Sequence, residues 1–291
     1  MIIYFFIPGS NTQPISDIQK TADSILCQST SPSKIFAVGN IIDNLDSSVQ
    51  FLSTSSLNYA AMVNQSIQQV DDPFILLIDN HSSPIRLHVS AVDIFSLTMK
   101  RNPNASLIYS DYDLESNGDI QEIHLLHHHE GRVRDNQDYG KVFCIRKSAL
   151  LDCGGFDESL KYNSMYDLRL KLSERGELIR IANRYSGSLH TVKAQKESVN
   201  VFDYLMENKD SQEEAEHICT EHLKRIGAYL PPEKYYEKRP DPKHNPSVKA
   251  SVIIPVNERP EFIGTALESC LNQTIQDIEI IVVVNGGEND I

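Results

Sequence analysis

The stretch KASVIIPVNERPEF, from Lys249 to Phe262, runs from an apolar segment of strand length into a proline, which is typical of the start of an α/β domain. The chain opens in the same way, because its first residues include FFIPGSNTQP. The helix expected after each strand carries a similar motif, DSILCQST near the start and ESCLNQT near the end, and the next strands, KIFAVGN and EIIVVVN, both end in Asn. These matches predict two β-α-β units of one plan, separated by a whole domain.

Between these two units, apolar runs of strand length alternate with longer segments of helical period, which favours a parallel α/β fold. We expect strands at residues 2–7, 34–38, 73–79, 105–111 and 177–182. We expect helices at residues 15–27, 58–70, 83–101 (with Pro84 in its first turn), 165–175 and 202–226, the last as one or two helices. Residues 231–248 are rich in proline and charge, which is typical of a linker.

The composition argues against several kinds of partner. The 291 residues include 27 Lys and Arg against 40 Asp and Glu, a net charge of −13, so we expect no nucleic-acid partner. No apolar run approaches the roughly 20 residues of a membrane helix, and the opening MIIYFFIPG lacks the basic start of a signal peptide. The five cysteines are widely spaced and form no metal-binding motif. Reduced thiols in a cytoplasmic protein are therefore expected, with peripheral association at the inner membrane face left open.

Taken together, the motifs resemble the family-2 glycosyltransferases, which are enzymes of GT-A fold. At the end of the chain the resemblance rests on IIPVNE, LESCLNQT and IIVVVNGG. In the first domain it rests on FIPGSN, SILCQST, FILLIDNHSSP, NPNASLIYSD, CIRKSALLDCGGFDESL and YDLRLKLSERGE. The resemblance implies an α/β fold of GT-A type, a Rossmann-like three-layer sandwich with a mostly parallel central sheet, followed by a C-terminal helical extension.

The resemblance also divides the chain into four parts. Residues 1–192 look like a GT-A domain, residues 193–230 like a helical extension and residues 231–248 like a linker. Residues 249–291 look like the start of a second GT-A domain in a longer tandem protein. Because an isolated β-α-β unit exposes strand edges and an apolar face, we expect this segment to pack against the first domain, to pair between chains or to be poorly ordered.

Sugar transfer from a nucleotide sugar requires an anchor for the diphosphate, usually a divalent cation held by carboxylates. Asp79 ends the apolar run FILLID, and His81 follows where the family usually has the second Asp of an Asp-x-Asp motif. The resemblance implies that Asp79 and His81 hold Mn²⁺ or Mg²⁺ together with the diphosphate, and imidazole suits Mn²⁺ better than Mg²⁺. The alternative is a strand-end Asp beside a solvated His.

The resemblance also places the nucleotide beside the ends of the first two strands, at Pro8, Gly9, Ser10, Asn11, Gly39 and Asn40. Further along the chain, Arg132 and Arg134 in EGRVRDNQDYG share one face if the segment is extended, and together they could grip a diphosphate. Surface ion pairing is the alternative for both arginines.

The acceptor hydroxyl needs a base, and here the sequence departs from the family. The family's acids precede x-Asp-Leu, whereas NSMYDLRL has Ser164 and Met165 there, and a thioether cannot accept a proton. Asp167 remains, but by resemblance its role is structural. Asp111 and Asp113 in YSDYD close a strand on the same sheet edge as the expected metal site, and two nearby carboxylates can raise one pKa toward that of a base. The simpler interpretation makes both of them acids of a strand-end turn.

The first hypothesis is an inverting glycosyltransferase of the hexosyltransferase type, which moves a sugar from a UDP- or GDP-linked donor to a glycan or polysaccharide acceptor. The second is a non-catalytic GT-A module that binds a sugar or nucleotide, or that supports a catalytic second domain. The lack of acids at Thr12, Gly39 and Met165 favours the second hypothesis, whereas Asp79 suits both.

Overall fold

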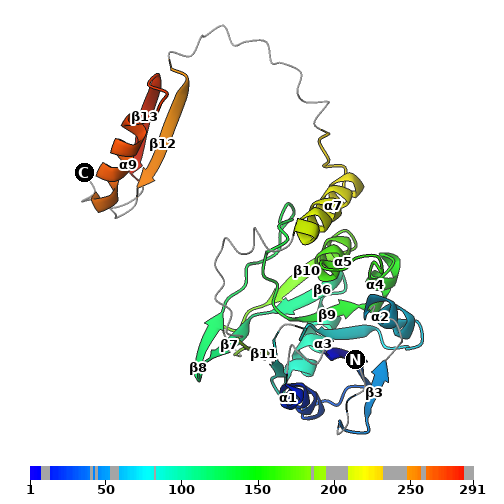
Figure 1. Cartoon of the computed structure of the whole chain (residues 1–291). Coiled ribbons are helices and arrows are strands. Elements are labelled where there is room, and N and C mark those ends of the chain that lie inside the picture. Colours follow the sequence, from blue (N-terminus) through cyan, green and yellow to red (C-terminus); the bar gives the residue numbers. More distant parts are fainter. Residues whose placement is uncertain are drawn as a thin grey trace. The chain divides into compact units, whose positions relative to one another are not determined.

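The computed structural model describes residues 1–7, 14–39, 42, 45–52, 59–81, 83–184, 187–194, 209–231, 248–256 and 260–284. The chain divides into two compact units, Met1–Tyr229 and Leu230–Ile291 (Figure 1). The sheets, helices and cavities described next belong to the first unit, and the second unit is described separately.

The first unit is built on a mixed, mostly parallel sheet, as expected. Among the described residues this sheet has seven strands, in the order β10 (Glu177–Ile181), β6 (Ala105–Ser110), β9 (Val142–Arg146), β4 (Phe74–Ile78), β1 (Ile2–Ile7), β2 (Lys34–Gly39) and β3 (Val49–Leu52). Strand β9 runs antiparallel to β4 and β6, and the other neighbouring strands pair in parallel. Strand β3 was not predicted from the sequence.

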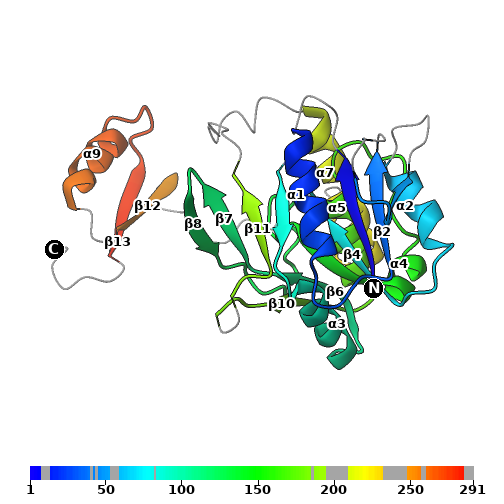
Figure 2. The ribbon, with the colours of Figure 1, turned by 90° about the horizontal axis from the view of Figure 1, so that it is seen from below.

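Helices cover both faces of this sheet, which gives the three layers that the sequence implies (Figure 2). Strand β1 is buried throughout because its side chains alternate between two cores. Ile2, Tyr4 and Phe6 pack with α2 (Tyr59–Ile67), α4 (Lys147–Asp152) and α5 (Ser164–Ser173). The alternate residues Ile3, Phe5 and Ile7 pack with α1 (Ile15–Leu26) and α3 (Ala91–Arg101).

The helix that we expected over residues 83–101 is shorter than predicted, because its first part belongs to a second, smaller sheet. Within that range, Ile85–Leu87 form strand β5, and the helix begins only at Ala91. Pro84 therefore precedes a strand and not a helix. The short segment is a strand because Ile85 and Leu87 are buried while Arg86 between them is exposed, and it pairs antiparallel with β11 (His190–Lys193).

The same small sheet contains a hairpin that the sequence analysis missed. Strands β7 (Tyr112–Ser116) and β8 (Asp119–Ile123) pair antiparallel across Asn117 and Gly118, whose φ angles are 54° and 91°. An Asn-Gly pair with positive φ angles is a common two-residue hairpin turn, so the dipeptide was the available signal. Strand β7 also pairs in parallel with β11, which completes the order β5-β11-β7-β8.

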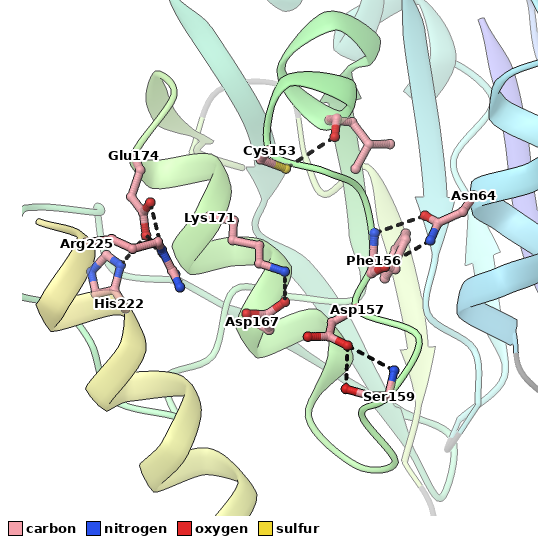
Figure 3. A network of polar contacts seen from close by, with 11 residues as sticks. Asn64, Cys153, Phe156, Asp157, Ser159, Asp167, Lys171, Glu174, His222 and Arg225 are labelled. Carbon is pink, nitrogen blue, oxygen red and sulfur yellow. Dashed lines mark hydrogen bonds and ion pairs between the residues drawn. The ribbon is translucent and has the colours of Figure 1, made fainter.

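Helix α7 (Lys209–Arg225) lies within the predicted helical extension and packs against α5. Tyr166 and Leu170 of α5 form an apolar cluster with Ala215 and Ile218 of α7. Beside this cluster, Glu174 accepts a 2.7 Å hydrogen bond from His222 and pairs with Arg225 (Figure 3). Residues 195–208, which lead into α7, lie outside the described residues.

The second unit consists of β12 (Ala250–Val256), α9 (Pro260–Leu271) and β13 (Ile278–Val284). Its two strands pair in parallel from Ala250↔Ile278 to Val256↔Val284, just as β1 and β2 pair in parallel around α1. The predicted repeat of one β-α-β plan is therefore confirmed. Most of the predicted linker, residues 232–247, lies outside the described residues.

In the described part of the chain, no helix combines the length and the apolar character needed to cross a membrane. All five cysteines are free thiols, and Cys144 is buried within β9.

Candidate functional site

The candidate site lies where strands β1 and β4 end, at the edge of the sheet where parallel strands present their carboxyl ends. Asn80, immediately after β4, is fully buried and ties the two strand ends together. Its side-chain oxygen accepts a hydrogen bond from the Phe6 amide, and its side-chain nitrogen donates to the Phe6 carbonyl, both at 2.7 Å. These two hydrogen bonds fix the backbone between Asp79 and His81.

Asp79 contacts two basic side chains. Its Oδ1 lies 3.0 Å from Nδ1 of His81, and its Oδ2 lies 3.7 Å from Nζ of Lys141. Burial alone would raise the pKa of Asp79, but the hydrogen bond with His81 and the charge of Lys141 outweigh it and hold the pKa below its usual range. Asp79 is therefore a carboxylate at neutral pH.

Lys141 owes its position to the antiparallel pairing of β9 with β4. The Asp79 amide donates a 2.8 Å hydrogen bond to the Lys141 carbonyl, which continues the register in which Ile78 faces Val142. Directly opposed residues of two strands project to the same side of a sheet, so the ammonium lies beside the carboxylate. Lys141 was not predicted from the sequence, because no antiparallel strand was expected beside β4.

His81 is held between aromatic rings. Its imidazole packs on Phe6 with centroids 4.0 Å apart, and Tyr59 at the start of α2 meets it edge-on at 5.0 Å. Such packing fixes the plane of the imidazole ring. His81 is therefore partly covered by these two rings, and its side chain is 40% exposed.

Two cavities formed by described residues adjoin Asp79. The first cavity, of about 420 Å³, is largely apolar and is lined by Phe6, Tyr59, Ala60, Val63, Asp79, His81, Phe156, Lys161, Tyr162, Ser164 and Met165. The second cavity, of about 410 Å³, is more polar and is lined by Asp79, Tyr112, residues 135–141, Phe143, Met165, Tyr166 and Arg169. Asp79 and Met165 line both cavities, so the two meet at these side chains.

Asp79 Oδ1 and His81 Nδ1 share a hydrogen bond, so His81 would have to give up the proton between them before both atoms could occupy one edge of a hydrated divalent cation. Ligands at about 2.1 Å in adjacent positions of an octahedron lie about 3.0 Å apart. The observed separation of Asp79 Oδ1 and His81 Nδ1 is 3.0 Å. Among the described residues, no group of three His, Cys, Asp or Glu side chains could surround such an ion. Phosphate oxygens and water would have to complete its shell, as they commonly do for Mg²⁺.

The start of α5 carries no acid toward the cavities, in agreement with the sequence. Ser164 and Met165 line the first cavity, and Met165 also lines the second. Asp167, two residues after Met165, is only 5% exposed, and its Oδ2 lies 2.6 Å from Nζ of Lys171 (Figure 3). Burial raises the pKa of Asp167 despite that ammonium group. Its buried pairing with Lys171 within α5 supports the structural role expected for Asp167.

The contacts of Asp111 favour a structural role over that of a base. The side chain is fully buried and pairs with Arg180, whose Nε and Nη2 lie 2.7 and 2.5 Å from its two oxygens. The amides of Leu125 and Asn183 also donate to it, at 2.9 and 3.2 Å. Burial would raise the pKa of Asp111, but these hydrogen bonds and the Arg180 charge outweigh it and lower the pKa.

Asp113, the other candidate base from the sequence, lies within β7 and accepts a 2.6 Å hydrogen bond from the Ser188 hydroxyl. It lines neither of the cavities at Asp79, and the same is true of Asp111. The structure therefore does not bring these two carboxylates together with Asp79 in one cavity. Strand β9 separates β6, which precedes them, from β4.

Arg132 and Arg134 contribute backbone atoms here. Their carbonyl oxygens accept hydrogen bonds of 3.1 and 2.8 Å from the guanidinium of Arg169, which also packs over the ring of Tyr139 at 4.4 Å. Neither Arg132 nor Arg134 lines the cavities at Asp79. These contacts fix the backbone just before residues 135–141, which line the second cavity. They do not support binding of a diphosphate by the two arginine side chains.

Of the residues expected around the nucleotide, Pro8, Gly9, Ser10, Asn11 and Asn40 lie outside the described residues.

Gly39 is described, and its backbone requires a glycine. Its φ is +138°, and a Cβ there would lie 2.6 Å from the carbonyl oxygen of Ile7. A side chain at this position would push apart the ends of β1 and β2, where the nucleotide is expected.

The wall of the first cavity is held in place by α2. Asn64 of that helix accepts a hydrogen bond from the Phe156 amide and donates one to the Phe156 carbonyl, both at 2.9 Å (Figure 3). The preceding Gly155 has φ +75°, and a Cβ there would lie 2.5 Å from Asn64 Oδ1. The Gly-Gly pair thus forms a tight turn, as the sequence indicates, and this turn places Phe156 in the lining of the first cavity.

Helix α7 supports the same cavity through Glu214. This carboxylate accepts hydrogen bonds from the amides of Lys161, Tyr162 and Asn163, at 2.8, 3.0 and 2.7 Å. These bonds lower the pKa of Glu214, although burial opposes them. Lys161 and Tyr162 line the first cavity, so the predicted helical extension is connected to the candidate site.

Replacing Glu214 with Ala should destabilise the first unit by about 1.5–3 kcal/mol, because backbone donors lose a charged acceptor. Urea unfolding followed by circular dichroism measures the change. Glu213→Ala is the matched control, since Glu213 is exposed on the same helix and pairs only with Lys209 in the described contacts. Equal stability of the two variants would show that Glu214 does not anchor the loop.

The sequence of residues 251–291 matches the family model described as Glycosyl transferase family 2. No curated protein matches the chain significantly. Among solved structures, residues 1–349 of TarS from S. aureus are 14% identical, with 79% of this chain and 72% of that chain covered and a TM-score of 0.50. The same TarS fragment in complex with UDP is 12% identical, with 78% and 72% covered and a TM-score of 0.50.

A third solved structure is the mannosyltransferase PcManGT from Pyrobaculum calidifontis in complex with GDP-Man and Mn²⁺. It is 10% identical, with 79% of this chain and 76% of that chain covered and a TM-score of 0.46. Identities this low bear on the fold alone. The likeness to TarS confirms the expected α/β fold with its mixed, mostly parallel sheet.

Proposed function

We propose that the first unit is a GT-A-type glycosyltransferase domain that binds a nucleoside diphosphate sugar at Asp79 and transfers the sugar to a glycan hydroxyl. The observation that carries the proposal is the Asp79 carboxylate, held at the carboxyl end of β4 between His81 and Lys141 and open to the first cavity. A matching fold, a family-2 sequence pattern in residues 251–291 and UDP bound to TarS support it.

In this proposal the diphosphate lies beside Asp79, His81 and Lys141. Asp79 and His81 hold Mn²⁺ or Mg²⁺, which would offset negative charge on the leaving diphosphate. The Lys141 ammonium, 3.7 Å from Asp79, adds a second positive charge for phosphate oxygens. The donor sugar occupies the first cavity, whose aromatic walls exclude water from the anomeric carbon.

The nucleoside in this proposal extends toward the ends of β1 and β2, near residues 8–11, Gly39 and Asn40. The reaction is inverting: the acceptor oxygen attacks the anomeric carbon as its bond to the diphosphate breaks, and a base takes the hydroxyl proton. UDP- and GDP-linked hexoses are the proposed donors, and a polysaccharide or other glycan is the proposed acceptor.

A second candidate function is a non-catalytic module that binds a nucleotide or sugar and supports a catalytic domain beginning at residue 249. Met165 favours this function, because it stands where the family's base is expected and lines both cavities. The family match within residues 251–291 favours it as well.

Titration calorimetry and thermal shift against UDP, GDP and their sugars, with and without Mn²⁺, test the proposed function. We expect saturable binding of one nucleotide that strengthens with Mn²⁺. Release of UDP or GDP from the sugar nucleotide then separates an enzyme from a binding module. Absence of binding to every nucleotide would contradict the enzyme and leave a module that binds a sugar or supports another domain.

A further inference from the structure

The proposed reaction lacks a base at the position where the sequence leads one to expect it. Met165 has no basic atom, Asp111 is bound to Arg180 in the interior, and Asp113 is bound to Ser188 away from the cavities. An acceptor hydroxyl attacking near Asp79 must nevertheless lose a proton. The following inference rests on the proposed function and concerns where that proton goes.

The second cavity has the chemistry of a site for a polyhydroxylated acceptor. Residues 135–138, Asp-Asn-Gln-Asp, line it with carboxylates, which accept hydrogen bonds from hydroxyls, and with side-chain amides, which both accept and donate them. Tyr112 adds an aromatic face, and its ring stacks on His190 with centroids 5.4 Å apart. Because Asp79 and Met165 line both cavities, a molecule in the second cavity adjoins a donor in the first.

Within this cavity, Asp138 is held in a defined orientation. Its Oδ1 accepts a 2.7 Å hydrogen bond from the Gly140 amide, and its Oδ2 accepts a 2.9 Å hydrogen bond from the Tyr112 hydroxyl. Burial, followed by the charge of Asp138, raises the pKa of Tyr112, so its hydroxyl stays protonated and continues to donate. Each carboxylate oxygen retains a further lone pair for a substrate hydroxyl.

Asp138 also lies close in the chain to the diphosphate anchor. Lys141, three residues later, places its ammonium 3.7 Å from Asp79. Asp138 and Lys141 both line the second cavity, and so does Tyr112 of β7. The segment from Asp138 to Lys141 therefore connects the expected acceptor site with the expected donor site. The side chain of Asp138 is exposed and can reach a bound hydroxyl, unlike that of Asp111.

We propose that the second cavity binds the sugar acceptor and that Asp138 accepts the proton of the attacking hydroxyl. The acceptor oxygen forms a bond to the anomeric carbon, the bond from that carbon to the diphosphate oxygen breaks with its electron pair, and the proton passes to the Asp138 carboxylate. The products are the lengthened glycan and the nucleoside diphosphate, and the proton returns from Asp138 to solvent.

The test uses water and azide as acceptors, because neither requires knowledge of the natural glycan. UDP-GlcNAc, UDP-glucose and GDP-mannose are incubated with the full chain and Mn²⁺, and nucleotide release is measured for wild type, Asp138→Asn and Asp71→Asn. We expect Asp138→Asn to lose about 100-fold or more of the release rate. Asp71→Asn, which replaces an exposed acid that lines neither cavity, should keep the wild-type rate, and calorimetry should show equal UDP affinity for all three.

Azide provides a readout that a purely structural role would not give. Azide attacks as an anion and needs no base, so adding it to Asp138→Ala should restore nucleotide release and yield a glycosyl azide detectable by mass spectrometry. Wild-type release that persists in Asp138→Asn overturns the role of Asp138 and leaves the proposed function intact. A wild-type chain that binds UDP but releases none from its sugars overturns both the role and the enzyme. Absence of UDP and GDP binding contradicts the proposed function itself.

Discussion

Replacing Asp79 with Asn should lower nucleotide release from the preferred sugar donor by at least about 100-fold, because several kcal/mol of charge stabilisation at the diphosphate depend on that carboxylate. The amide keeps the shape of the side chain but carries no charge for a cation or for the contacts with His81 and Lys141. Steady-state kinetics on the donor identified by calorimetry give the rate. The melting temperature should stay within about 2 °C of wild type, since no buried apolar contact is removed.

Asp71→Asn is the matched control for this experiment. Asp71 is an exposed acid just before β4, so its replacement changes the net charge equally without touching the cavities. We expect full activity from this control. If Asp79→Asn retained the wild-type rate in the same assay, the first unit would not be the catalytic domain. An essential acid in a domain beginning at residue 249 would then be the alternative.

Replacing Asp111 with Ala should destabilise the first unit by about 3–5 kcal/mol, because it leaves the partly buried guanidinium of Arg180 without its partner. The two amides that donate to Asp111 lose their acceptor as well. Urea unfolding monitored by circular dichroism measures this loss. Asp119→Asn, an exposed acid of the β8 strand, serves as the control and should change the stability by less than about 0.5 kcal/mol.

A double replacement separates the ion pair from the packing around it. Arg180→Met alone leaves a buried carboxylate without its main partner, whereas Asp111→Ala with Arg180→Met removes both charges. We expect the double variant to be more stable than the sum of the single losses implies. Strict additivity would show that the two side chains contribute independently.

The same ion pair predicts how stability depends on pH. The pKa of Asp111 is lower in the folded chain than the value of about 3.9 in an unfolded chain. The unfolded chain therefore takes up a proton first as the pH falls, and the contribution of Asp111 is fully present above about pH 5 and is lost progressively as the pH falls from about 4 through the lower pKa of the folded chain. The stability difference between wild type and Asp111→Asn should shrink over that range. A difference that stayed constant down to about pH 3 would contradict the assignment.

The sequence predicted five strands of the main sheet, all but β3 and β9, and the position of Asp79 at a strand end, because these depend on local patterns. Apolar runs that end in Asp or Asn mark buried parallel strands, and such strands place their ends at one edge of the sheet. The repeat between the first strand and the segment at Lys249 could also be predicted, because it too is a local sequence pattern. The helix predicted at residues 83–101 is present only from Ala91, because three residues of alternating burial, Ile85–Leu87, belong to a separate small sheet.

The remaining parts of the site depend on pairings between distant segments, which no local pattern reveals. Lys141 reaches Asp79 only because β9 runs antiparallel to β4, and Glu214 reaches the loop before α5 only because α7 packs on that helix. Asp111 seemed a candidate base because it follows a strand on the correct edge. Its partner Arg180 comes from β10, which pairs with β6, and this contact changes its role.

The most direct test of the account is a crystal structure of the chain with UDP and Mn²⁺. We expect the diphosphate beside Asp79, with His81 and Asp79 facing the ion, Lys141 within reach of a phosphate oxygen and the nucleoside toward the ends of β1 and β2. Nucleotide bound instead at residues 250–284, or in the separate cavity lined by Arg146 and Gly176 at the other end of the sheet, would contradict it.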